Sequence, residues 1–179
     1  MEKNVWHGID SERFKRYRHW KTPKGYLCGT YAASVLVAYY QDYLDETMVP
    51  TFIRRKNSRD VQTLASVLQI FVQYHGLPTI SWQVAHGLSR FFSYYDYPIS
   101  GRATYLGGWQ RAVKRIDQGK PVIIGVNRFF GSTYGNHWVV AYAYLEDEQG
   151  NRFFKVHDNW GNHEANIPVN WVNGTVSLP

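Results

Sequence analysis

Two hydrophobic patterns divide the chain, a helical pattern in the first two thirds and a strand-like pattern in the rest. Residues 29–43 carry apolar or small side chains on nearly every helical face, which predicts a buried central helix. Apolar residues at helical spacing predict a second helix over about 61–75, which Asp60 can cap. The same spacing predicts further helices over about 84–94 and from 109 to 116.

From residue 121 the pattern becomes rich in β-branched and aromatic residues. The runs 121–126, 137–144 and 152–157 predict three strands, and 171–178 predicts a fourth. Residues 146–151 predict the turn between the second and third strands. These short runs with a turn between them are typical of antiparallel pairing.

The order of elements, helices first and sheet afterwards, predicts an α+β fold. A chain of 179 residues is long enough to bury the core of one domain. We therefore expect a single domain over residues 1–179, with a mainly helical lobe over about 25–118. An antiparallel sheet lobe over about 119–179 would follow.

Cys28 is the only cysteine of the chain, and it stands at the start of the predicted central helix. An intrachain disulfide is therefore excluded. The unpaired N–H groups of a helix start favour thiolate over thiol, and the thiolate is the nucleophilic form. The alternative is a structural thiol that packs as a small hydrophobic side chain.

His137 and Asp158 meet in the predicted hairpin. The residue numbers of antiparallel partners have a constant sum, and a turn centred near 148–149 gives a sum of about 297. His137 then lies opposite the residues that follow the last strand of the hairpin, Asp158 among them. With Cys28 as nucleophile, this His and this Asp complete a catalytic triad. The imidazole transfers the proton, and the carboxylate orients the imidazole. Asn159 is an alternative for the orienting role.

Three segments resemble, in order, the motifs of papain-like cysteine peptidases. They are Gly25–Ala33 around Cys28, Asn136–Val140 around His137, and Asp158–Gly161. With the strand Gly119–Ile123 before the second motif, the chain resembles the bacterial group that includes bacteriocin-leader (double-glycine) processing peptidases.

The resemblance implies a papain-like fold, with a helical N-terminal lobe, a central helix and an antiparallel sheet lobe. It implies a peptidase that hydrolyses a peptide or protein substrate through a thioester acyl-enzyme, without a cofactor or a metal. Cys28, His137 and Asp158 would be its catalytic residues, and Trp160 would shield the Asp–His pair from water.

The chain departs from the family at the oxyanion hole. The family usually supplies a Gln several residues before the cysteine, whereas no Gln precedes Gln41 here. The backbone N–H of Cys28 can be one donor, and the other would come from Tyr26, Thr22, His19 or a backbone amide. Loss of one such donor typically costs about a hundredfold in rate. A slow peptidase, an unusual donor and an inactive cleft all remain open.

Two alternatives to a peptidase remain. Amidases and acyltransferases use the same triad on related folds, so the fold does not fix the reaction. A peptide-binding module with an inactive cleft would also suit the missing Gln.

Net charge is +6, with six basic residues between Arg13 and Lys24 interleaved with Phe14, Tyr17 and Trp20. We interpret this stretch as a solvated segment whose aromatic side chains pack on the body. The alternative is a surface that binds nucleic acid or another anionic polymer, and we do not expect a nucleic-acid partner. The run that begins at Arg54 predicts a surface loop.

Other chemistry has weaker support. His157, His163 and Glu164 make an incomplete ligand set for zinc, and the pair Gly107–Gly108 lacks the Lys and Ser/Thr of a phosphate-binding loop. No apolar run approaches the length of a membrane span, and no targeting segment is recognisable. A cytoplasmic protein is the default expectation, and a secreted one would follow if a signal peptide had been removed.

Overall fold

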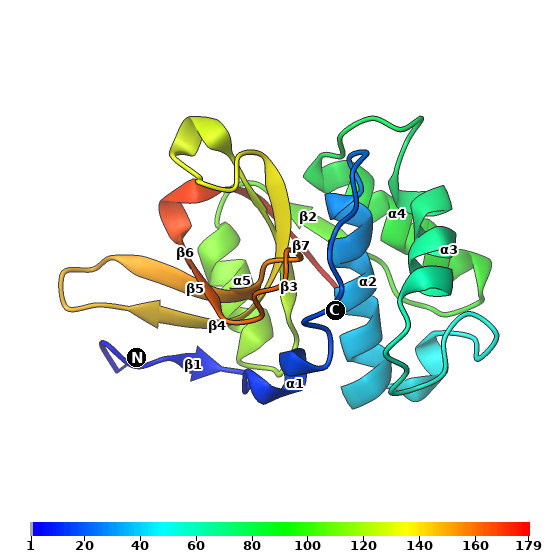
Figure 1. Cartoon of the computed structure of the whole chain (residues 1–179). Coiled ribbons are helices and arrows are strands. Elements are labelled where there is room, and N and C mark those ends of the chain that lie inside the picture. The colour runs from blue at the N-terminus through cyan, green and yellow to red at the C-terminus, as the bar shows by residue number, and fades with distance from the viewer. Residues whose placement is uncertain (1) are drawn as a thin grey trace.

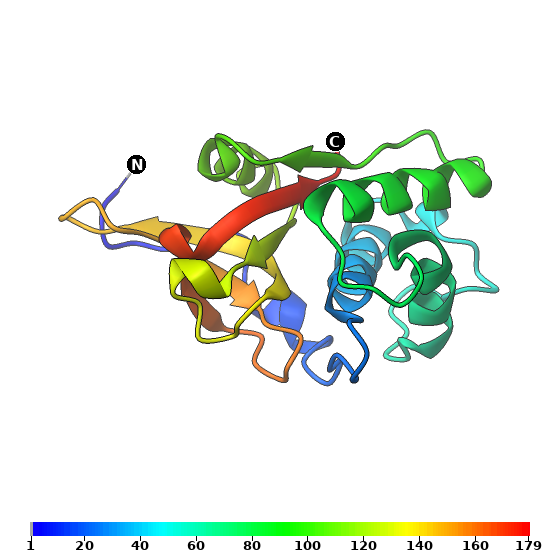
Figure 2. The same ribbon diagram turned by 90° about the horizontal axis from the view of Figure 1, so that it is seen from above.

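Helix α2, Cys28–Tyr43, lies between a sheet on one side and helices α3, Gln62–Val72, and α4, Ser81–Tyr94, on the other (Figure 1). This computed structural model describes residues 2–179. Seen from above, α2, α3 and α4 gather on one side of the molecule and most strands on the other (Figure 2). Nearly all of α2 is buried because it packs against both layers, which explains the apolar side chains on all its faces.

The seven-stranded sheet has the order β2-β7-β3-β4-β5-β6, and β1 pairs with β4 beyond the end of β3. All of these pairs are antiparallel. The strands are β1 (His7–Gly8), β2 (Arg102–Thr104), β3 (Val122–Val126), β4 (His137–Glu146), β5 (Arg152–His157), β6 (Ala165–Pro168) and β7 (Val172–Ser177).

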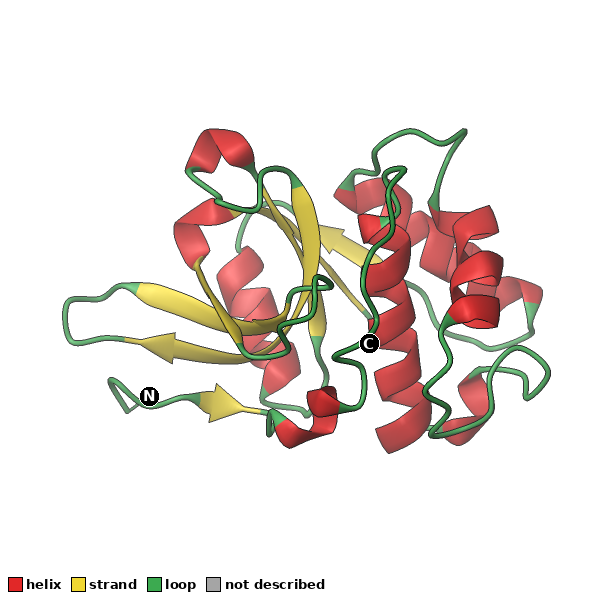
Figure 3. Cartoon of the chain, viewed as in Figure 1, coloured by secondary structure: helices red, strands yellow, loops and turns green. Residues whose placement is uncertain are grey.

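The two faces of the sheet bury different helices. Val140 and Tyr142 of β4 belong to the cluster around α2, whereas Val139 and Ala141 pack in the cluster around α5, Gly108–Ile116. Since neighbouring residues of a strand point to opposite faces, α2 and α5 cover opposite sides of the sheet. In the view coloured by secondary structure, α5 is seen on the side of β3 that faces away from α2 (Figure 3). The remaining short helices are α1 (Glu12–Lys15), η1 (Glu46–Met48), η2 (Arg128–Phe130) and η3 (Val169–Trp171).

The α+β architecture predicted from the sequence is confirmed. The pairs Val140–His157 and Ala141–Val156 have the predicted register, and an irregularity after Ala141 shifts the pairing by one residue towards the turn. The register is set by the short turn between β4 and β5 and by the two buried faces of β4, both of which are visible in the sequence.

The structure differs from the predicted lobe boundary near residue 118. Strand β2 pairs with β7, and α5 packs on the sheet, so both belong with the sheet although they precede that boundary. The sequence signal for β2 is weak because the strand has only three residues. Strands β1 and β6 were not predicted either, and each is short.

The basic segment is anchored by its aromatic residues, as predicted. Phe14 and Tyr17 are 0% exposed and Trp20 is 3% exposed. Phe14 stacks on Tyr39 and Tyr142, at ring-centroid distances of 5.0 Å and 4.2 Å. The backbone of this segment is therefore fixed against both α2 and β4.

The prediction that Arg54 lies in a surface loop is wrong, because its side chain is buried. Its guanidinium makes two hydrogen bonds of 2.8 Å to the Asp42 carboxylate of α2. The hydroxyl of Tyr17 donates to the same carboxylate at 2.7 Å. A sequence run of basic residues cannot show which one turns inward, since that depends on an acid twelve residues earlier.

Candidate active site

Cys28, the first residue of α2, and His137, the first residue of β4, line one cavity of about 290 Å³. The sulfur comes from the helix side and the imidazole from the sheet side. No Lys, Arg, Asp or Glu side chain lines this cavity. We call it the cleft.

The Cys28 sulfur lies against strand β4 as well as its own helix. Burial raises the pKa of the Cys28 thiol, whereas hydrogen bonds from the backbone N–H groups of Gly29, Trp138 and Cys28 itself favour the thiolate. Trp138 directly follows His137, and both line the cleft with Cys28. The net direction is opposite to the one expected from a helix start alone, because the thiol is largely removed from water.

The imidazole of His137 is held by a main-chain group. Its Nε2 lies 2.7 Å from the carbonyl oxygen of Asp158. A carbonyl only accepts hydrogen bonds, so Nε2 carries the hydrogen and Nδ1 is the nitrogen free to exchange a proton. Burial lowers the pKa of His137, and the contacts with Asp158 oppose this shift.

The Asp158 carboxylate organises the loop that follows β5. One oxygen accepts from the backbone N–H groups of Trp160, at 2.7 Å, and Asn162, at 3.0 Å. The other accepts from the Tyr134 hydroxyl at 3.2 Å. Asp158 thus contacts the imidazole through its carbonyl and uses its side chain to fix the turn that presents this carbonyl.

Asn159, the alternative orienting residue, is fully buried. Its amide nitrogen donates to the carbonyl of Trp138 at 3.0 Å, and its amide oxygen lies 2.9 Å from Nδ1 of His157. It ties the ends of β4 and β5 together and has no hydrogen bond to His137 among the bonds of residues 2–179.

Aromatic rings cover the imidazole. The Trp160 ring centroid lies 4.4 Å from that of His137, and the Tyr134 ring stacks on His137 at 5.9 Å. Trp160 is 49% exposed, so one side of its ring faces solvent. This placement is the one expected of a side chain that shields the His137–Asp158 contact.

The three candidate oxyanion donors lie in different places. Tyr26 lines the cleft with Cys28, but its side chain is 60% exposed. The backbone N–H of Thr22 donates to the Asn159 carbonyl at 2.7 Å, which puts Thr22 beside the loop that holds His137. Its hydroxyl is buried and lacks a hydrogen-bond partner among residues 2–179. His19 is exposed and lines a different cavity.

Trp138 is a cleft residue whose role was not predicted. Its indole N–H donates to the Thr79 carbonyl at 3.3 Å, which links β4 to the segment before α4 across the cleft. A Cβ at Gly125 of β3 would lie 3.0 Å from this indole and 2.5 Å from the Asn173 side chain. Glycine at that position therefore makes room for the indole. The spacing of apolar residues does not reveal such a bridge, because Trp138 reads as an ordinary strand residue.

In residues 2–179 no three His, Cys, Asp or Glu side chains gather into a group able to hold a metal ion. None of the described helices is long and apolar enough to cross a membrane.

Comparisons with known proteins agree with the fold described above. Over 96% of its length the chain is similar to two solved structures. One is the recombinant stem bromelain precursor (13% identity, 69% of that chain, TM-score 0.58), and the other is the bromelain protease from Ananas comosus in complex with the E64 inhibitor (15% identity, 97% of that chain, TM-score 0.54). These likenesses show a papain-like fold. A search of curated proteins gives no match. Residues 11–174 match the Peptidase_C39 like family, and the chain belongs to that family.

Proposed function

We propose that this protein is a cysteine peptidase in which Cys28 is the nucleophile and His137 the acid–base. The observation that carries the proposal is the shared cleft, which Cys28 lines from the start of α2 and His137 from the start of β4. The membership of a peptidase family supports the same reaction class.

The pKa directions favour a neutral thiol and a neutral imidazole at rest. Burial disfavours both charged forms, raising the pKa of Cys28 and lowering that of His137. We therefore propose that Nδ1 of His137 removes the thiol proton as the sulfur attacks the substrate carbonyl. The tetrahedral intermediate then collapses to a thioester, and the imidazolium gives its proton to the leaving amine. Nδ1 then takes a proton from a water molecule as its oxygen attacks the thioester. The C–S bond breaks, the carboxylic acid product leaves, and the imidazolium returns the proton to the sulfur.

Three groups take part in this cycle without exchanging protons. The Asp158 carbonyl holds Nε2–H, so the neutral ring has its free nitrogen at Nδ1 whenever it has to accept a proton. The backbone N–H of Cys28 is a donor for the oxyanion, and Thr22 is our choice for the second because its buried hydroxyl is unpaired among the described residues.

The cleft favours an uncharged stretch of polypeptide. Its lining combines Tyr26, Pro78, Ile80 and Val126 with amide side chains and lacks any Lys, Arg, Asp or Glu. A charged substrate residue would lose its hydration there without gaining an ionic partner. We infer a peptide substrate with apolar or small residues around the scissile bond.

Incubation of the protein with a library of proteome-derived peptides tests this function, with cleavage sites read by mass spectrometry. We expect wild type to cut at positions flanked by uncharged residues and to form a covalent acyl adduct on Cys28. The Cys28→Ala and His137→Ala variants should do neither, while circular dichroism shows them folded. An added primary amine separates hydrolysis from acyl transfer, since a transferase would give amide products. Wild type that leaves every peptide intact and carries no adduct would refute the proposal.

A further inference from the structure

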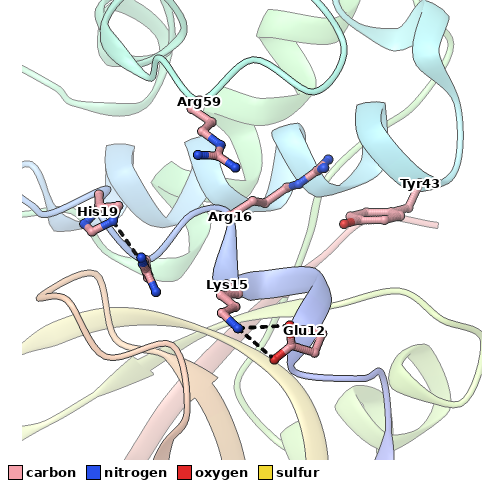
Figure 4. Close-up of a pocket in the computed structure, with 7 residues that line it drawn as sticks. Glu12, Lys15, Arg16, His19, Tyr43 and Arg59 are labelled. Carbon is pink, nitrogen blue, oxygen red and sulfur yellow. Dashed lines mark hydrogen bonds and ion pairs between the residues drawn. The ribbon is translucent and has the colours of Figure 1, made fainter.

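A second cavity, of about 280 Å³, lies at the other end of α2 from the cleft and is lined mainly by cationic side chains (Figure 4). Its lining comprises Glu12, Lys15, Arg16, Arg18, His19, Tyr43 and Arg59. Tyr43 ends the sixteen-residue helix that Cys28 begins, and such a helix is about 24 Å long. The two cavities share no lining residue, so this basic pocket is a separate feature.

The positive charge of the basic pocket is only partly neutralised. Four cationic side chains line it against one carboxylate, Glu12, which pairs with Lys15 at 3.3 Å. Arg16 lies 3.3 Å from Asp42, but that carboxylate already binds Arg54 through both of its oxygens. One buried acid thus serves two guanidinium groups.

Two arginines are left for a ligand. Within residues 2–179 neither Arg18 nor Arg59 makes a salt bridge, and the Arg59 side chain makes no hydrogen bond. The Nε of Arg18 donates to the imidazole of His19 at 2.9 Å. Figure 4 shows Arg59 entering from the α3 side and Lys15 from α1, so cations approach the pocket from two separate elements.

The pocket is held in shape before any ligand binds. The buried rings of Phe14, Tyr17 and Trp20 fix the backbone between its cationic residues. The Arg16 guanidinium also lies 5.4 Å from the centroid of the Tyr43 ring. A fixed backbone limits the ordering cost of binding an anion to the cationic side chains themselves.

We propose that the basic pocket binds a compact multivalent oxyanion of the phosphate or pyrophosphate class. A guanidinium group can bind two phosphate oxygens at once. Several cations around one concavity favour a compact ligand of high charge density over an extended one. A volume of 280 Å³ is several times the roughly 30 Å³ that a water molecule occupies, so it has room for such an ion with part of a carrier molecule.

An extended single-stranded nucleic acid fits this pocket less well. Binding of that kind relies on aromatic rings free to stack on bases. The three aromatic residues within the basic segment are buried, and the Tyr43 ring is approached by the guanidinium groups of Arg13 and Arg16.

Calorimetric titration with sodium pyrophosphate, at constant ionic strength, tests the proposal. Arg59→Gln and Arg55→Gln form a matched pair, because both arginines are exposed, belong to one loop and lack side-chain hydrogen bonds among the described residues. Only Arg59 lines the pocket. We expect pyrophosphate to bind wild type saturably. Arg59→Gln should weaken this binding about tenfold or more, because it removes one charge-assisted hydrogen bond. Arg55→Gln should change affinity by about twofold at most, as expected for an exposed charge that does not line the pocket.

Three results would overturn the proposal. The first is a titration of wild type that gives no saturable heat. The second is an equal loss of affinity in both variants. The third is a labelled single-stranded oligonucleotide that binds through Arg59 and is not displaced by pyrophosphate. Inorganic phosphate, titrated in parallel, distinguishes a free ion from the end of a larger phosphorylated molecule. Cys28→Ala should bind pyrophosphate as wild type does, so the outcome is independent of the peptidase proposal.

Discussion

His137 contacts Asp158 through the main chain, with 2.7 Å between Nε2 and the carbonyl oxygen. The Asp158 side chain instead bonds the backbone of Trp160 and Asn162 and the hydroxyl of Tyr134. Asp158 therefore positions the imidazole by shaping the turn, and the charge of its carboxylate acts on the ring from a distance.

Asp158→Asn and Asp158→Ala should differ sharply in activity. Asparagine keeps a side-chain oxygen for the two backbone N–H groups, so we expect turnover to fall by about tenfold or less. Alanine leaves those N–H groups without their acceptor and frees Trp160, so we expect a fall of about a hundredfold or more and a loss of about 1–3 kcal/mol in stability. Steady-state kinetics on a cleaved peptide and urea unfolding measure both. Equal inactivation by the two variants would mean that the carboxylate itself holds the imidazole.

The pH–rate profile should have a wide plateau. Neutral imidazole is the form that accepts the thiol proton, and it persists as pH falls until the lowered pKa of His137 is reached, below the ordinary 6.5. The thiol supplies that proton and persists until the raised pKa of Cys28 is passed, above the ordinary 9.0. We expect kcat/KM to be flat between these limits, decreasing on the acid side with His137 and on the alkaline side with Cys28.

A kinetic plateau alone does not show which atom holds the proton, because a thiolate–imidazolium pair has the same number of protons. The ultraviolet absorbance of the thiolate distinguishes the two forms when the spectrum of Cys28→Ala is subtracted. We expect no thiolate band at neutral pH. A band that is already complete at pH 7 would show that the ion pair is the resting state and that burial is not the dominant influence.

Thr22 and Tyr26 can be separated as oxyanion donors. A buried hydroxyl without a partner costs about 1–3 kcal/mol, and a hydrogen bond to the oxyanion would offset that cost during the reaction. We expect Thr22→Val to lower kcat by about a hundredfold without loss of thermal stability, and Thr22→Ser to keep most of the activity. Tyr26→Phe is the matched removal of the other hydroxyl and should leave kcat unchanged. The reverse pattern would assign the donor to Tyr26.

The parts of the fold visible in the sequence are those with local signals. The buried α2 and the β4–β5 register follow from apolar patterns and a short turn, and these also bring Asp158 near His137. The carbonyl contact could not be foreseen, because it depends on how Asp158 turns after β5. The raised pKa of Cys28 also escapes the sequence, since burial is a property of the assembled cleft.

Contacts between residues far apart in the chain could not be predicted from the sequence either. The bridge from Trp138 to Thr79 joins residues far apart in the chain, and neither carries a spacing signal. Arg54 looked like its neighbours in a basic run, yet of that run Arg54 is the one that pairs with Asp42 on α2. Tertiary packing determines which residues become partners in this way, and these contacts affect stability as well as function.

Arg54→Ala should destabilise the protein far more than Arg55→Ala, which removes the same charge from the next residue. Burial alone would raise the pKa of Asp42, but hydrogen bonds from Arg54 and Tyr17 hold it below its ordinary value. Removing Arg54 leaves a buried carboxylate without its main partner, which costs about 3–5 kcal/mol. Arg55 is exposed, so its loss should cost within about 0.5 kcal/mol. Urea unfolding measures both, and the double variant Asp42→Asn/Arg54→Gln should recover part of the loss because it removes both charges together. Similar unfolding midpoints for the two alanine variants would show that this buried ion pair contributes little to holding α2 against the loop.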